Sequence, residues 1–80
     1  MTLEDIPPSL RKYFDQNPEV LSGKLRVYGT RISVEQVLEL IEAGVSPADI
    51  VRSYPSLSER DVAAVERLAA YYARRTLQLA

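Results

Sequence analysis

The side chains best suited to binding lie in a basic stretch, residues 20–34. It holds three cations and no acidic residue, and Tyr28 and Thr30 add hydroxyl groups between the charges. Such a surface attracts anions, and a two-stranded ribbon fits the major groove of DNA. An alternative for Arg31 is an ion pair with nearby Glu35, whereas Lys24 and Arg26 are harder to explain as structural residues. We therefore predict a DNA-binding ribbon whose contact residues are Lys24, Arg26, Tyr28, Thr30 and Arg31.

Catalytic chemistry has little support. Glu35, Glu39 and Glu42 share one face of a predicted helix, and carboxylates so spaced can bind a divalent metal. A solvated acidic face is the far commoner meaning of this pattern. The chain has no histidine or cysteine, which removes the usual general base and the softest metal ligands. We expect no enzyme, no metal site and no cofactor.

The basic stretch also predicts its own local structure. Leu25 and Val27 alternate with polar neighbours at the two-residue period of a half-buried strand. Gly29 accepts a positive φ at little cost, so the chain can reverse there, and Ile32 closes the apolar pattern. We predict a short two-stranded β-ribbon over residues 20–33 with Gly29 as its structural turn.

Three serines mark the starts of three helices. Ser33, Ser46 and Ser58 each precede by three residues a side chain that can reach back to the helix start, and Ser33 with Gln36 fits the capping box best. Gly44 suits a left-handed cap at the end of the first helix. The predicted helices cover residues 34–43, 47–54 and 59–77.

The remaining N-terminal residues 1–19 read as an arm or short helix. Leu10, Tyr13 and Phe14 would face inward, and a turn would follow from Asp15 to Pro18. Eighty residues allow one small domain, so we expect a single domain over residues 1–80 with a helical bundle over 34–80. The fold class is mainly α: a tri-helical, helix-turn-helix-like bundle preceded by the ribbon.

The third helix carries two apolar stripes, which is more than a small core needs. We predict that one stripe meets a second copy of the chain in a homodimer or higher homo-oligomer. Tyrosine suits such an interface because its ring is buried while its hydroxyl stays hydrogen-bonded. The predicted interface residues are Leu68, Tyr71, Tyr72 and Leu77.

Charge is segregated along the chain. Its net value of −1 combines −2 over residues 1–19, +3 over 20–34, −5 over 35–66 and +3 over 67–80. One interpretation is that the surface carries charges of both signs, which cluster along the sequence by chance. The other is that two basic segments flank an acidic centre and meet different partners. The acidic starts of the second and third helices count against base reading by those helices.

Several motifs resemble one known family. They are Gly23-Lys24, the run from Gly29 to Val34, Ala43-Gly44, the run from Tyr54 to Ser58, and Asp61-Val62. From about Val20 to Ala73 the chain resembles the domain-of-unknown-function family numbered 433. The resemblance implies a homeodomain-like helix-turn-helix fold and similarity to antitoxins, whose partner resembles a PIN-type ribonuclease toxin.

The predicted function is therefore that of an antitoxin in a type II toxin–antitoxin pair. It would occlude the acidic metal site of a PIN-like ribonuclease and regulate its own operon through operator DNA. Because the chain starts without a signal-like segment, the cytoplasm of a prokaryote is the expected location. The alternative is a non-enzymatic, oligomeric protein-interaction module that binds no DNA, which the overall acidity favours.

Overall fold

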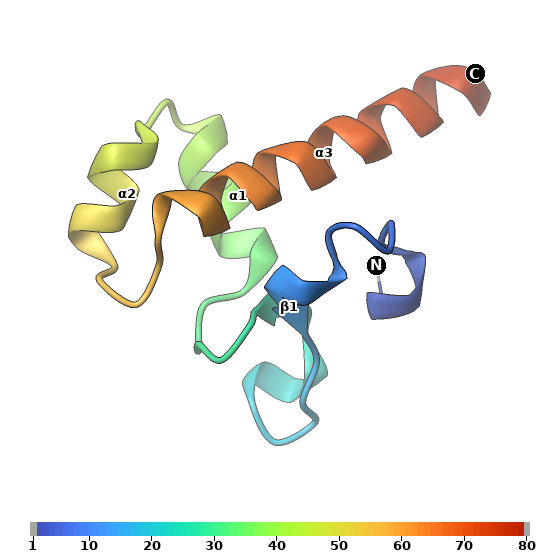
Figure 1. Cartoon of the computed structure of the whole chain (residues 1–80). Helices are drawn as coiled ribbons and strands as arrows, with labels where there is room; N and C mark the ends of the chain where they lie inside the picture. The colour runs from blue at the N-terminus through green and yellow to red at the C-terminus, as the bar shows by residue number, and fades with distance from the viewer. Residues whose placement is uncertain (1, 80) are drawn as a thin grey trace.

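Three helices pack around one core, and a small β-ribbon lies against them in the computed structural model, which describes residues 2–79 (Figure 1). The helices are α1 (Val34–Glu42), α2 (Pro47–Ser53) and α3 (Glu59–Leu79). The strands are β1 (Phe14–Asp15) and β2 (Arg26–Val27). Short 3-10 helices cover Leu3–Asp5, Arg11–Tyr13 and Leu21–Gly23. The predicted fold class is confirmed.

Serine caps begin the helices where the sequence predicts them. The Ser33 and Ser46 hydroxyls accept from the amides of Gln36 and Asp49, at 3.0 and 3.2 Å. The reciprocal capping box, however, forms at the third helix. There Ser58 Oγ accepts from the Asp61 amide at 3.2 Å, and the Asp61 carboxylate accepts from the Ser58 amide at 2.9 Å. The Gln36 side chain instead donates to the Tyr54 hydroxyl at 3.3 Å.

Gly44 ends α1 in the left-handed conformation, with φ of +86°. Its amide donates to Ile41 O and the Val45 amide donates to Leu40 O, both at 3.0 Å. These two bonds satisfy carbonyls that the end of a helix leaves unpaired, as in a Schellman motif. The prediction that Gly44 is a structural turn residue is confirmed.

The ribbon is built differently from the prediction. Its two strands, β1 and β2, lie before and after the Leu21–Gly23 segment in the sequence. They pair antiparallel, with Phe14 opposite Val27 and Asp15 opposite Arg26. Asp15 therefore belongs to a strand and not to the predicted turn. The predicted second strand near Ile32 makes only an isolated bridge, between Arg26 and Ser33.

The turn at Gly29 is present as predicted. Gly29 has φ of +74°, and the Thr30 amide closes the turn by donating to Val27 O at 3.0 Å. The Val27 amide donates to Ile32 O, also at 3.0 Å, so the chain does reverse between these two residues. The turn thus brings the second half of the basic stretch back beside β2.

We expect Gly29→Val to lower the free energy of unfolding by roughly 1–2 kcal/mol, because a β-branched residue is strained at positive φ. A Cβ on Gly29 would meet no atom within 4 Å, so backbone strain is the whole cost. Gly29→Asn is the matched control, since asparagine tolerates this conformation. Denaturant unfolding of both variants measures the difference. Equal stability of the valine variant and the original protein would contradict the prediction.

The core joins the N-terminal segment to all three helices. Ile6, Leu10 and Phe14 are each at most 3% exposed, so the N-terminal segment packs into the core, with Leu10 and Phe14 facing inward as the sequence predicts. The other buried apolar residues are Leu25, Val27, Ile32, Val34, Val37, Ile50, Leu57, Val62, Ala64, Val65 and Leu68. In Figure 1 the last turns of α3 extend past the rest of the chain. Within residues 2–79, no helix is long and apolar enough to cross a membrane.

Candidate nucleic-acid interface

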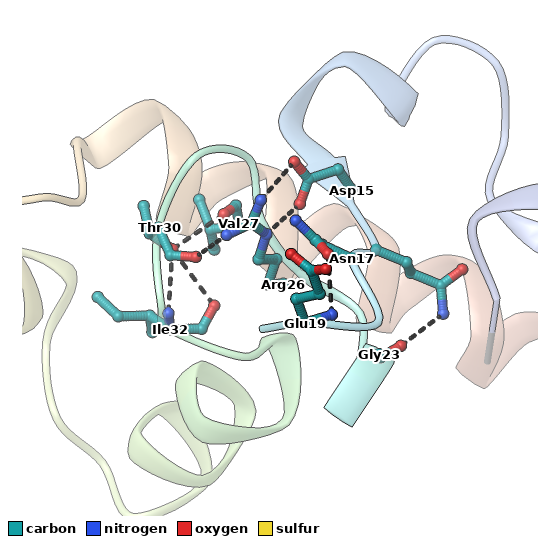
Figure 2. A network of polar contacts seen from close by, with 9 residues as sticks. Asp15, Asn17, Glu19, Gly23, Arg26, Val27, Thr30 and Ile32 are labelled. Carbon is teal, nitrogen blue, oxygen red and sulfur yellow. Dashed lines mark hydrogen bonds and ion pairs between the residues drawn. The ribbon is translucent and has the colours of Figure 1, made fainter. Parts of the chain in front are cut away.

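Arg26 holds the ribbon together (Figure 2). Its guanidinium makes a two-pronged contact with the Asp15 carboxylate across the strand pair, with Nη2 and Oδ2 3.1 Å apart. The third guanidinium nitrogen, Nη1, donates to Thr30 O at 2.8 Å. The Arg26 and Asp15 side chains are only 13% and 24% exposed. Arg26 therefore has a structural role, which corrects the prediction that it is a DNA contact and hard to explain as a structural residue.

Thr30 is also occupied within the fold. Its hydroxyl donates to Val27 O at 2.9 Å and accepts from the Ile32 amide at 3.1 Å, as Figure 2 shows. Thr30 is 8% exposed. Because both hydrogen-bonding functions of the hydroxyl are used inside the turn, it is not free to contact DNA. The predicted contact role of Thr30 is thereby corrected to that of a turn residue.

Three predicted contact residues do lie at the surface. Lys24 and Arg31 are exposed, and the Tyr28 side chain is 66% exposed beside the Gly29 turn. It is Lys24, and not Arg31, that lies 4.0 Å from the Glu35 carboxylate, so the alternative proposed for Arg31 does not form. Within residues 2–79 Arg31 has no ion pair. The exposed part of the predicted DNA surface thus consists of Lys24, Tyr28 and Arg31.

The acidic face of α1 has no sign of a metal site. Glu35, Glu39 and Glu42 are all exposed. Among residues 2–79 no three potential ligands come close enough together to hold a metal ion.

Leu68 is 1% exposed and belongs to the core of its own chain, beside Ala64 and Val65. The interface role predicted for Leu68 is therefore corrected. Residues of both apolar stripes of α3 are used within the chain, because Ala64 and Leu68 are buried in the core together with Val62 and Val65. Leu77, by contrast, is 75% exposed.

The two tyrosines of α3 are half-buried against the N-terminal segment. The Tyr72 hydroxyl donates to Asp5 O at 3.3 Å, and burial raises the pKa of this phenol. The Tyr71 hydroxyl accepts from Arg75 Nη1 at 2.8 Å, and the two tyrosine rings meet edge to face. A hydrogen bond from the Thr2 hydroxyl lowers the pKa of the Asp5 carboxyl in the same region. These contacts fasten the start of the chain to α3.

One basic feature escaped the sequence reasoning. Arg60, Arg67 and Arg74 lie seven residues apart on α3, and all three are exposed. In the sequence Arg60 belongs to the acidic start of the third helix, whereas Arg67 and Arg74 belong to the basic segment 67–80, so segment charges alone do not reveal the row. The seven-residue spacing was the available signal, because it places side chains on one face of a helix.

The comparisons with known proteins identify a family but no individual relative. A family model described as a protein of unknown function (DUF433) matches residues 15–72. Searches of curated proteins and of solved structures each found no match. The matched region takes in Asp15 of β1, all of β2, α1 and α2, and the first two thirds of α3. The chain therefore belongs to the DUF433 family of proteins of unknown function.

Proposed function

We propose that this protein is the antitoxin of a type II toxin–antitoxin pair, acting in the cytoplasm of a prokaryote on a PIN-like ribonuclease and on operator DNA. One observation carries the proposal: within residues 2–79, exposed arginines lie away from any carboxylate partner, Arg31 at the tip of the ribbon among them. A guanidinium binds carboxylates and phosphates through a planar fork of donors. It therefore suits both the acidic metal site of a ribonuclease and the backbone of DNA.

The ribbon supports the DNA part of the proposal in a modified form. Arg26 and Thr30 stiffen the turn from inside, while Lys24, Tyr28 and Arg31 face outward from it. A rigid turn presents these three side chains with little loss of conformational entropy on binding. We propose a homodimer or higher homo-oligomer as the acting form, with the exposed Leu77 and the half-buried Tyr71 at the contact between copies.

Co-expression with the product of the adjacent reading frame tests the proposal. We expect a stable complex that co-purifies, with ribonuclease activity that is absent from the complex and returns when this protein is removed. Expression of the neighbour alone should arrest growth. A neighbour that neither co-purifies nor affects growth would contradict the proposal.

The alternative is an oligomeric interaction module that binds protein and no DNA. The net charge of −1 and the pI of 5.3 favour it, since most nucleic-acid-binding domains are basic. It predicts a partner that co-purifies without having ribonuclease activity, and no binding to the chain's own upstream DNA at any salt concentration.

A further inference from the structure

The exposed side of α3 carries a regular row of positive charge, here named the arginine row: Arg60, Arg67 and Arg74. Seven residues of helix rise about 10.5 Å and complete almost two turns, so the three side chains leave one face over a length of roughly 21 Å. Ala63 and Ala70 stand between them on the same face. These small residues allow a rigid partner to approach the helix closely.

Three shallow hollows follow one another along the arginine row. The first lies between Arg60 and Arg67 beside Tyr13, and the second, of about 290 Å³, lies between Arg67 and Arg74. The third, at the C-terminal end, is lined by Tyr71, Arg74, Arg75 and Gln78. Each hollow has two arginines at its edge, and no carboxylate lines any of the three. Each is therefore suited to an anionic group held between two guanidinium groups.

The charge of the arginine row is not neutralised by the protein. Within residues 2–79, its three members take part in no ion pair, whereas Arg26 and Arg52 pair with Asp15 and Asp49. Asp61, beside Arg60 in the sequence, is occupied by the Ser58 amide in the helix cap. Glu59 and Glu66 precede Arg60 and Arg67 in the sequence, but within residues 2–79 neither glutamate forms an ion pair with the row.

The ribbon joins the row at its Arg60 end. The Tyr28 amide donates to Tyr13 O at 2.8 Å, and Tyr13 lines the first hollow. The Lys12 amine lies 5.3 Å from the centre of the Tyr13 ring and adds a further cation there. Tyr13 therefore links the strand that precedes the Gly29 turn to the first hollow of the arginine row.

We propose that the arginine row binds the sugar-phosphate backbone of duplex DNA without reading its sequence. A folded acidic protein presents scattered carboxylates, whereas a duplex presents about one charge per 1.7 Å along its whole length. A row that repeats every 10.5 Å or so over almost four turns suits such a continuous polyanion. Contacts of the three arginines with phosphates would position the protein on the duplex, whereas base contacts specify the sequence. The inference rests on the DNA-binding part of the proposed function and is independent of the toxin.

The test titrates a labelled duplex of the chain's own upstream region, and an unrelated duplex of equal length, with the full chain between about 50 and 200 mM salt. We expect Arg67→Ala, at the centre of the row, to weaken binding to both duplexes roughly tenfold. The control is Arg52→Ala, which removes an exposed arginine of α2 that is already paired with Asp49, and this change should leave affinity unchanged. The triple variant Arg60→Ala/Arg67→Ala/Arg74→Ala should flatten the dependence of log K on log salt by about 3.

Helix formation is not at risk, because alanine is at least as good a helix former as arginine. Unaltered thermal unfolding of the variants checks this. DNA binding that survives unchanged in the triple variant would overturn the inference, whether or not Lys24→Ala/Arg31→Ala abolishes it. Equal affinity of the original protein for polyglutamate of matched charge would overturn it too and indicate an acidic protein partner. Co-purification with the toxin is measured on the same triple variant. Failure of the DNA inference leaves this co-purification intact, whereas failure of the antitoxin proposal abolishes it.

Discussion

Leu68→Ala is expected to lower the free energy of unfolding by about 3 kcal/mol, within the range of roughly 2–5 kcal/mol for truncating a buried leucine. Leu68 is 1% exposed and packs in the core that the N-terminal segment completes. A chain of 80 residues has a total stability of only about 4–12 kcal/mol, so this loss is a large part of it. The midpoint temperature of thermal unfolding should fall by roughly 10–25 °C.

Leu77→Ala is the matched control on the same helix. Leu77 is 75% exposed, so its truncation should change the stability of a single chain by less than about 0.5 kcal/mol. If α3 forms the proposed contact between copies, Leu77→Ala weakens self-association in sedimentation experiments instead. A Leu68→Ala variant that dissociates to a monomer of full stability would show that Leu68 serves an interface and not the core.

The helices were predictable because their signals are local. A serine cap, a proline or acidic first turn, and a glycine after the last turn each act within a few residues of the helix end. Ser33, Gly44 and Ser58 accordingly gave bounds that agree with the structure to within two residues. The same locality explains the Gly29 turn.

The partner of β2 was not predictable in this way. β1 has two residues, too few for an alternation pattern, and it follows directly on a 3-10 helix that looks like the start of an α-helix. Its pairing with β2 depends on burying Phe14 opposite Val27, a contact between segments 13 residues apart. Non-local contacts of this kind leave no periodic trace in the sequence.

In the candidate site, too, properties set by the local sequence were predictable and those that depend on non-local contacts were not. That the stretch is basic could be seen from composition, and Tyr28 and Arg31 are indeed exposed. That Arg26 is used inside the fold could not be seen, because its partner Asp15 lies in the strand that was read as a turn. Without β1 in the prediction, nothing in the sequence distinguishes the partly buried Arg26–Asp15 ion pair from an unpaired charge.

Arg26→Ala should therefore unfold the ribbon and not merely weaken binding. We expect a loss of about 2–3 kcal/mol, because the change leaves the Asp15 carboxylate in a site 24% exposed without its partner and removes the donor to Thr30 O. The measurement is denaturant unfolding of the variant beside Arg31→Ala. Arg31 is exposed and unpaired within residues 2–79, so its loss should cost less than about 0.5 kcal/mol.

The double variant Asp15→Leu/Arg26→Met distinguishes a paired charge from lost packing. When both partners are replaced by apolar side chains, no charge is left unpaired, so the double variant should be more stable than Arg26→Ala. If all the cost came from packing of the arginine stem, the single change Asp15→Leu would be neutral. If Arg26→Ala retained full stability and lost only DNA affinity, Arg26 would be a binding residue, as the sequence alone suggested.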